Sequence, residues 1–291
     1  MPRTEILTFE EIARVVRTGV SLGLTKVRLT GGEPTVRADL PLLVRMLRQI
    51  DGLAEISMTT NASLLADLAA PLKQAGLDRV NISLDTLKRD RATALARRDV
   101  LPAVLAGIDA AIRNQLSPVK LNAVVIRGQN DDELADLLCF AADRNAEMRF
   151  IEYMPMGEAR HGVSDQTVTA AEMRQRLSTR FDLVRDGSRD PQDPARGWIC
   201  RRTGARAGFI TSVSEHFCHT CNRMRLTAEG GLRPCLHQDA EVDVRRILRT
   251  GGGEGAIVDA FKQAAGLKWE GHRMTQLVPL YSRREMVAIG G

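Results

Sequence analysis

Apolar and polar positions follow two alternating periods over residues 9–150. Helical spacing begins directly after Thr8, and Glu11 three residues later completes the pattern of a capping box. The spacing predicts helices over residues 9–22, 40–49, 64–74, 103–114 and 133–144, with Gly76 placed to end the third. Short apolar or β-branched runs predict strands over residues 26–30, 56–60, 79–84, 120–126 and 148–153. Strands that alternate with helices predict βαβ units, right-handed crossovers and an α/β fold with a parallel sheet.

The alternation is predicted to stop near Gly157. Residues 185–208 are rich in Arg, Asp, Pro and Gly, which is typical of a loop or a loose hairpin. A run of three glycines, residues 251–253, precedes one further predicted helix within residues 240–265. We therefore expect two parts: residues 1–156 with the parallel sheet, and residues 157–291 as an extension.

Polar side chains lie near the carboxyl ends of the predicted strands. They are Thr59, Ser83, Asp85 and Asn122. Loops at this edge of a parallel sheet are where ligands bind, although such side chains also cap the helices that follow. Met154 ends the last predicted strand at the same edge, and its own pattern predicts a core residue.

The turn Gly31-Gly32-Glu33-Pro34 follows the first predicted strand directly. Its glycines allow a ligand to approach the backbone closely, and Glu33 is a candidate acceptor for a ligand amine. The alternative is an ordinary strand-to-helix turn.

Composition adds a preference for anionic ligands. The 291 residues carry a net charge of +5 with a pI near 9.2, but aromatic residues make up only 4%, which argues against nucleic acid as a partner. No apolar run is long enough to cross a membrane and no N-terminal segment resembles a signal peptide. We therefore expect a cytoplasmic protein.

Three of the five cysteines are grouped, at Cys218, Cys221 and Cys235. In a reducing compartment this spacing favours metal ligands over disulfides, and three thiolates leave one coordination position open. Spacing alone does not separate an iron–sulfur cluster from zinc, for which His216, His219 and His237 are candidate fourth ligands. Cys139 is predicted to be a core residue, and Cys200 has no assigned role.

Four cations are predicted on strands or beside the cysteines: Arg28, Lys120, Arg223 and Arg225. If the sheet curls into a barrel, alternate strand residues point inward. Buried cations are costly unless they are paired, so we expect a wet cavity that receives a triphosphate or carboxylates. Arg223 and Arg225 are two residues apart on an extended segment and should share one face. Surface salt bridges are the alternative.

Together these segments resemble the GTP 3′,8-cyclase family of radical S-adenosylmethionine (SAM) enzymes. The resemblance runs nearly end to end and includes residues 5–11, 26–34, 80–85, 120–125, 150–157 and 217–236 and the Ile-Gly-Gly terminus. The segment from Cys218 to Cys235 is highly specific to this family, whereas the double-glycine turn is shared by radical SAM enzymes generally.

The resemblance implies an incomplete (β/α)6 barrel over residues 1–156 and an α+β extension over 157–291. It implies a second [4Fe–4S] cluster on Cys218, Cys221 and Cys235, with guanine approaching its free iron, and a Gly290-Gly291 tail that reaches into the active site. The implied GTP contacts are Arg28, Thr59, Lys120, Arg223, Met224 and Arg225. The implied SAM contacts are Gly32, Ser83 and Met154. It singles out no catalytic residue.

The reaction implied by the family is the first step of molybdenum cofactor biosynthesis. Cleavage of SAM gives a 5′-deoxyadenosyl radical, which abstracts the ribose 3′ hydrogen of GTP. The carbon radical then attacks C8 of guanine and gives 3′,8-cyclo-7,8-dihydro-GTP. An electron donor, a downstream cyclic pyranopterin monophosphate synthase and a homodimer are the partners that the family implies.

One family feature is not found in this sequence. The Cys-x-x-x-Cys-x-x-Cys loop of the first cluster should lie just before Pro2-Arg3, and no cysteine precedes Cys139. We therefore expect that the barrel strand before the loop is also missing, that strand 26–30 lies at an open edge, and that the chain is inactive alone. The alternatives are a non-catalytic nucleotide-binding iron–sulfur protein and a zinc-stapled nucleic-acid-binding module.

Overall fold

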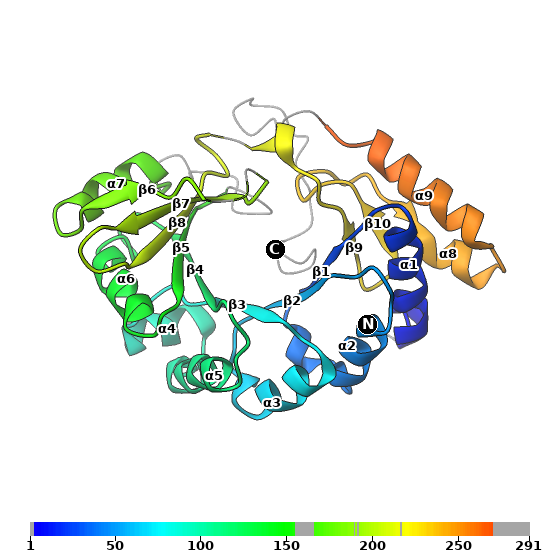
Figure 1. The fold of residues 1–291 in the computed structure, drawn as a ribbon, viewed down its shortest axis with the longest axis horizontal. Coiled ribbons are helices and arrows are strands. Elements are labelled where there is room, and N and C mark those ends of the chain that lie inside the picture. The colour runs from blue at the N-terminus through cyan, green and yellow to red at the C-terminus, as the bar shows by residue number, and fades with distance from the viewer. Residues whose placement is uncertain (1–2, 155–165, 189, 191, 216, 270–291) are drawn as a thin grey trace.

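An eight-stranded sheet organises the computed structural model, which describes residues 3–154, 166–188, 190, 192–215 and 217–269. The strand order is β1-β2-β3-β4-β5-β8-β7-β6, and the strands curve into an arc with helices along the outer side (Figure 1). The strands are β1 (Lys26–Leu29), β2 (Glu55–Thr60), β3 (Arg79–Ser83), β4 (Lys120–Val125), β5 (Glu147–Glu152), β6 (Leu183–Arg185), β7 (Ala195–Cys200) and β8 (Arg206–Ile210). β1 to β5 and β8 are parallel, so the predicted α/β class with a parallel sheet is confirmed.

The helices confirm most of the predicted periodicity. They are α1 (Phe9–Ser21), α2 (Leu40–Arg48), α3 (Leu65–Ala75), α4 (Arg89–Ala96), α5 (Leu101–Arg113), α6 (Leu134–Ala142), α7 (Ala170–Ser178), α8 (Val244–Arg249) and α9 (Glu254–Gly266). The capping box is present: Thr8 N–H donates to Glu11 at 2.8 Å, and Glu11 N–H donates to the Thr8 hydroxyl at 3.2 Å. Gly76 ends α3 with a φ of 104°, as predicted. In the described part of the chain, every helix is too short or too polar to cross a lipid bilayer.

Side-chain alternation divides the sheet into an apolar face and a polar face. Val80, Leu121 and Phe150 point to the helix side and are fully buried in one large core. Their strand neighbours point the opposite way, into the concave side of the arc (Figure 1). The hydrophobic pattern that holds the helices to the sheet therefore also fixes which residues face inward.

The predicted end of the alternation near Gly157 is wrong. Helix α7 follows β5, and β8 then pairs with β5 in parallel, from Glu147 opposite Arg206 to Ile151 opposite Ile210. The region 185–208, predicted as a loop or a loose hairpin, carries β7, which forms an antiparallel hairpin with β8 and continues the sheet. The sheet thus runs without interruption across the expected boundary at residue 156.

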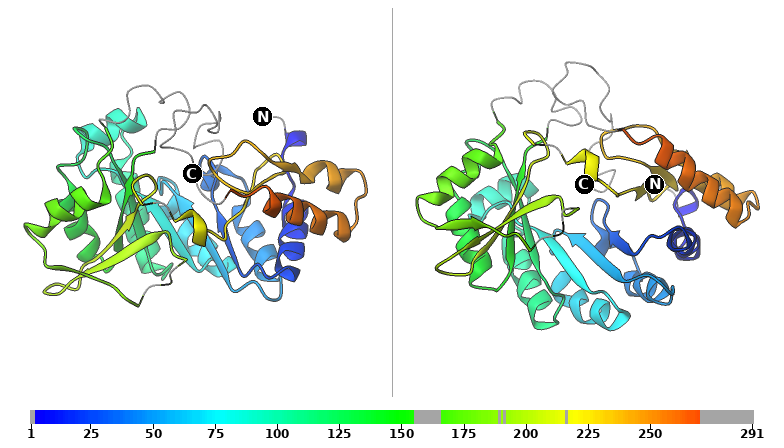
Figure 2. Two further views of the ribbon diagram at one scale, coloured as in Figure 1. Left: turned by 90° about the horizontal axis from the view of Figure 1, so that it is seen from above. Right: turned by 45° about the horizontal axis from the view of Figure 1, so that its top comes forward.

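A second core joins the C-terminal region to the start of the chain. Leu7 and Val15 are buried with Leu232, Val242, Val244, Leu248, Ile257, Ala260 and Ala264. A small antiparallel sheet of β11 (Val242–Asp243), β10 (Gly231–Arg233) and β9 (Arg225–Leu226) belongs to this core, and α9 lies beside α1 (Figure 2). Arg249 fastens the contact by donating to Glu11 at 2.9 Å.

Close packing of α5 against the start of α3 gives a test of this fold. A Cβ on Gly107 would clash with the carbonyl oxygen of Ala62, which is backbone and has little freedom to move. Gly107→Ala should lower the free energy of unfolding by about 2 kcal/mol. The measurement is urea denaturation followed by circular dichroism.

Gly255, in the first turn of α9, is the matched control because nothing lies within 4 Å of the position its Cβ would take. Gly255→Ala should be neutral or stabilising by up to about 1 kcal/mol. Equal effects of the two substitutions would contradict the packing of α5 described above.

Candidate anion and cofactor site

Four of the five parallel strands β1 to β5 bring a cation to the concave face of the sheet. Register pairs Arg28 with Ser57 and Ser57 with Arg79, and it places Lys120 opposite Asn81. Arg149 pairs with Asn122, two residues beyond Lys120 on β4. Residues in register on adjacent strands point to the same side, so Arg28, Arg79, Lys120 and Arg149 share this face. The predicted inward orientation of Arg28 and Lys120 is therefore confirmed.

Carboxylates offset part of this positive charge. Arg79 bonds Glu55 at 2.7 Å, and Arg149 bonds Glu147 at 2.8 Å. Arg149 also donates to Asp193 at 2.8 Å, while the Lys120 ammonium lies 3.8 Å from the same carboxylate oxygen. The side chain of Arg149 is only 3% exposed, so it depends on these two partners.

Burial and mutual repulsion lower the pKa values of these cations, which favours binding of an anion. Burial lowers the pKa of Lys120 to about 8, and the neighbouring Arg149 adds to this effect. The pKa of Arg28 falls to about 10 for the same reasons, with Arg79, Arg149 and Arg223 as the repelling groups. Although the surrounding protein atoms lower its pKa, Arg28 remains accessible to solvent, as a residue that lines a concave surface does. An incoming polyanion would relieve this repulsion.

The segment that follows the cysteines brings further cations to the same place. Arg223 is close enough to Arg28 to lower its pKa, and its guanidinium lies 5.1 Å from the Phe217 ring. Met224 packs against the second core. Burial lowers the pKa of Arg225 to about 10, with repulsion from Arg223 as the next cause. The structure thus brings Arg223 close to Arg28, and Arg225 lies near Arg223 and the cysteines.

The three grouped cysteines lie next to these arginines. Cys218 begins a short 3₁₀ turn (Cys218–Thr220), and Cys221 N–H donates to the Cys218 carbonyl at 3.1 Å. Lys268 joins the two arms of the group: its ammonium lies 3.5 Å from Cys221 Sγ, 2.7 Å from the Arg223 carbonyl and 3.4 Å from the Pro234 carbonyl. Pro234 directly precedes Cys235, so both arms meet at one lysine.

Three cysteine thiolates suit a soft metal centre. Among the described residues, however, the side chains are not gathered into a group of three potential metal ligands. Burial raises the pKa of Cys221, but Arg223, Lys268 and hydrogen bonds outweigh it, and the net pKa is lowered. A thiol that ionises readily beside cations is what a soft, thiolate-bound metal requires. Among the residues that the structure describes, His219 and His237 do not join the cysteines in a group of three potential metal ligands.

The double-glycine turn lies at the carboxyl edge of β1. Gly31 has a φ of 149°, which favours glycine, and Gly32 is exposed. The carboxylate of Glu33 already accepts hydrogen bonds from Thr35 and Thr60, both at 2.6 Å, and from Asn61 N–H at 2.7 Å. Glu33 therefore secures the turn to β2, and its Oε2, which accepts from Asn61 N–H, keeps capacity for a ligand amine, so that role stays a prediction.

The other predicted contacts lie along the same edge or on the same face. Ser83 ends β3 and is exposed, and Met154 follows β5 and is half-buried. Thr59 accepts a hydrogen bond from the Asn81 amide at 3.4 Å. His216, Gly157 and the Gly290-Gly291 tail lie outside the described residues.

Sequence reasoning missed several residues of the site. Arg79 and Arg149 gave a signal, because each is a charge within or beside a strand that otherwise reads as buried. Asp193 and Lys268 gave none, since one lies in an irregular segment and the other follows a helix.

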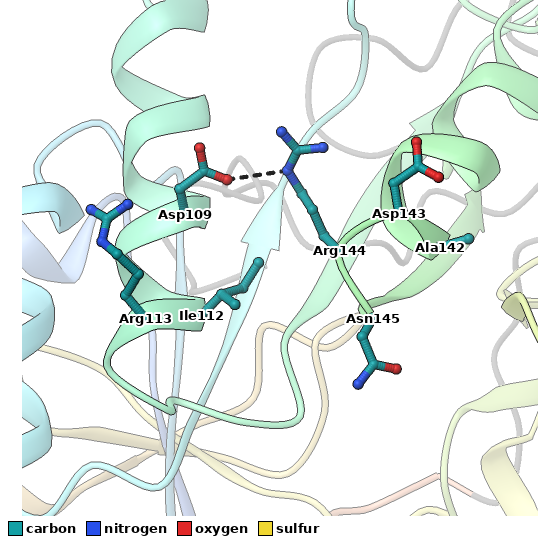
Figure 3. Close-up of a pocket in the computed structure, with 7 residues that line it drawn as sticks. All are labelled: Asp109, Ile112, Arg113, Ala142, Asp143, Arg144 and Asn145. Carbon is teal, nitrogen blue, oxygen red and sulfur yellow. Dashed lines mark hydrogen bonds and ion pairs between the residues drawn. The ribbon is translucent and has the colours of Figure 1, made fainter.

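A shallow depression on the outer surface is separate from this site. It lies between the C-terminal ends of α5 and α6 and is lined by Asp109, Ile112, Arg113, Ala142, Asp143, Arg144 and Asn145 (Figure 3). Its principal polar contact is internal, from Arg144 to Asp109 at 3.1 Å. It offers no group of convergent side chains comparable to the concave face.

Comparison with known proteins identifies the class. Residues 1–141 match the model of the radical SAM superfamily, and residues 146–274 match that of Molybdenum Cofactor Synthesis C. The crystal structure of Streptococcus suis SuiB bound to S-adenosylmethionine superposes with a TM-score of 0.58 at 16% identity, over 87% of this chain and 61% of that one. The fold and the sequence match together define a radical SAM enzyme.

Curated relatives narrow the assignment. GTP 3′,8-cyclase of Pelotomaculum thermopropionicum is 44% identical over 100% of this chain and 89% of its own length. That of Moorella thermoacetica is 46% identical over 93% of this chain and 83% of its own length, and that of Ectopseudomonas mendocina is 43% identical over 100% and 88%. The chain belongs to the GTP 3′,8-cyclase family.

The lowered pKa of Lys120 predicts a pH-dependent anion affinity. Only the protonated ammonium attracts phosphate, so affinity for inorganic tripolyphosphate should fall as the pH rises through about 8. Lys120→Arg should remove the part of this dependence that comes from the protein, because arginine stays charged throughout. Calorimetric titrations between about pH 7 and pH 9 would measure the difference between the two proteins.

The exposed Lys262 on α9 is the matched control. Lys262→Arg should follow the wild-type profile, which also contains the titration of the ligand itself. A Lys120→Arg profile that coincides with wild type would show that Lys120 does not titrate in this range.

Proposed function

We propose that the chain functions as a GTP 3′,8-cyclase, converting GTP to 3′,8-cyclo-7,8-dihydro-GTP in molybdenum cofactor biosynthesis. One observation carries the proposal: the cationic face of the sheet adjoins the segment that holds Cys218, Cys221 and Cys235. A nucleotide with a triphosphate at one end and a base with lone pairs at the other could engage both. The name shared by the curated relatives supports the same substrate.

The cations have the clearest proposed roles. Arg28, Lys120 and Arg223 would bind the triphosphate, and Arg149, buried beside Lys120, would add a fourth phosphate contact. Arg225 would lie closer to the cysteines, since Cys235 and Cys221 contribute to its electrostatic environment. Thr59 and Met224 would complete the nucleotide contacts. Charge neutralisation and fixed placement are what the protein contributes to radical chemistry.

The carboxyl edge of the sheet would bind SAM. Gly32 offers close backbone approach, Ser83 offers an exposed hydroxyl at the end of β3, and Met154 offers an apolar surface after β5. We assign residues 1–156 to the radical SAM barrel and residues 157–291 to the extension that completes the site. A cytoplasmic location, an electron donor, a downstream cyclic pyranopterin monophosphate synthase and a homodimer belong to the same proposal.

Cys218, Cys221 and Cys235 would hold a [4Fe–4S] cluster. When bound, such a cluster supplies an iron with an open coordination position for a substrate lone pair. The chain's own contribution is the thiolates, the lysine between them and the arginines beside them.

A binding protein without turnover is the second candidate. The 291 residues contain one group of three cysteines, because Cys139 lies on α6 and Cys200 on β7, apart from the group. Such a protein would bind GTP and one cluster without cleaving SAM.

Anaerobic purification and reconstitution test both candidates. We expect about four iron atoms and four sulfides per chain, and an electron paramagnetic resonance signal of the reduced cluster that GTP perturbs and ATP does not. Cys218→Ser should lose iron, whereas Cys139→Ser should keep it. Chromatography of the reaction mixture then separates the candidates: the cyclised product supports the enzyme, and unchanged GTP supports the binding protein. Stoichiometric zinc without iron would refute both.

Lys268 gives a sharper test of how the cysteines are held. Lys268→Met removes the ammonium that joins the Cys221 and Cys235 arms, so loss of iron to a chelator should become about tenfold faster. Lys268→Arg should restore most of the wild-type rate. Lys262→Met, on the same C-terminal region but exposed, should match wild type. Equal rates in all variants would remove Lys268 from the site.

A further inference from the structure

Asp193 is a carboxylate placed inside the cationic face. Its Oδ2 accepts from Arg149 at 2.8 Å and lies 3.8 Å from the Lys120 ammonium. Its Oδ1 accepts from Ala195 N–H at 3.0 Å, at the start of β7. One oxygen is thus fixed to its own backbone while the other meets two cations from β5 and β4.

This carboxylate differs from the other two on the same face. Glu55 and Glu147 belong to strands of the sheet, and each pairs with a neighbouring arginine. Asp193 instead comes from the irregular segment before β7 and reaches the cations from outside the strands. Arg149 also donates to Glu147 at 2.8 Å, so a second carboxylate offsets part of its charge beside Asp193.

The cations that Asp193 contacts are those that would serve a phosphate group. Burial raises the pKa of Asp193, but Arg149, Lys120 and the Ala195 hydrogen bond outweigh it, so the net pKa is lowered and the group is an anion at neutral pH. A phosphate oxygen that bound Lys120 and Arg149 would come close to this charge. The two anions would repel one another in a poorly solvated place.

We propose that Asp193 is an internal competitor: in the free protein it takes the position of a substrate phosphate on Arg149 and Lys120, and a bound polyanion must displace it. This inference rests on the proposed function of the face as a triphosphate site. Displacement favours ligands with several linked charges, because a single phosphate gains too few new contacts to replace the internal pair. Asp193 therefore lowers affinity and sharpens selection for the triphosphate.

The same segment also touches the cysteine region. The side-chain Oε1 of Gln192 accepts from the side-chain amide of Asn222 at 2.8 Å, and Asn222 lies between Cys221 and Arg223. Movement of Asp193 away from its cations would therefore be transmitted to the residue between a cysteine and an arginine of the site.

The direction in which Asp193→Asn changes ligand affinity tests this proposal. Asp193→Asn preserves shape and keeps an oxygen for Ala195 N–H, but removes the competing charge. We expect the dissociation constants for GTP and for inorganic tripolyphosphate to fall about tenfold in calorimetric titration. A carboxylate that merely positions Lys120 and Arg149 predicts weaker binding instead. Weaker or unchanged binding in the variant would overturn the inference.

Asp190→Asn is the matched control. Asp190 is exposed, belongs to the same segment and caps Gln192 N–H at 2.9 Å. The substitution makes the same charge change at a carboxylate that holds Gln192 N–H, and the affinities should stay within about twofold of wild type. Asp193→Ser is a second variant should Asp193→Asn fail to fold, and it should also tighten binding.

A pH profile tests the contact between Asp193 and Lys120. Asp193 raises the pKa of Lys120, while burial, Arg149 and Arg79 lower it and Glu147 raises it. In Asp193→Asn the loss of tripolyphosphate affinity should therefore begin at lower pH than in wild type. An unshifted profile would contradict the contact between Asp193 and Lys120.

The two ligands distinguish this inference from the proposed function. Tighter tripolyphosphate binding in the variant with no GTP preference would sustain the competitor and refute the nucleotide site. GTP binding by wild type that weakens in the variant would sustain the site and refute the competitor. No binding of either ligand to any variant would refute both.

Discussion

Repulsion among cations on one face of the sheet is the constraint on which the site depends. Arg28, Lys120 and Arg149 come from three strands that the hydrogen-bond register holds in place, so they cannot move apart without breaking the sheet. The repulsion lowers the pKa values of Arg28 and Lys120, and Arg149 is held by an ion pair with Glu147. Glu147 and Asp193 offset only part of it. The free protein therefore keeps uncompensated positive charge on this face, and an anionic ligand would neutralise it.

The same two-residue period builds both the core and the site. Along β5, Met148 and Phe150 enter the helix-side core while Glu147 and Arg149 face the concave side. A register slip by one residue would place Arg149 among apolar side chains and turn Phe150 toward the ligand. Gly208 on β8 belongs to this arrangement, because a Cβ there would lie 2.9 Å from the Glu147 carboxylate and 3.2 Å from Arg149 Cγ. The register of the strands therefore determines both the packing of the core and the positions of the charged side chains.

The sequence predicted the helices and strands in which apolar residues recur at regular spacing, and missed those in which this spacing is interrupted. α1 and β2 to β5 follow apolar spacing and were found within a residue or two. α4 is dominated by charged and small residues, so nothing in its pattern marks a buried stripe. β8 begins inside a segment rich in Arg, Asp, Pro and Gly that was predicted as a loop or a loose hairpin. The glycine of that strand, Gly208, is required by the Glu147–Arg149 pair across the sheet. Its role becomes visible only when the neighbouring strand is in place.

Site residues divide in the same way. Arg28 and Lys120 were predictable because strand position fixes their direction, whereas Asp193 and Lys268 reach the site only through tertiary closure. That closure depends on the second core, in which Leu7 packs with Leu232 and α9 lies against α1. The cationic face belongs to the first core and the cysteine arms are attached through the second. A ligand that spans Lys120 and Arg225 would therefore tie the two cores together, and its binding energy would add to the stability of their contact.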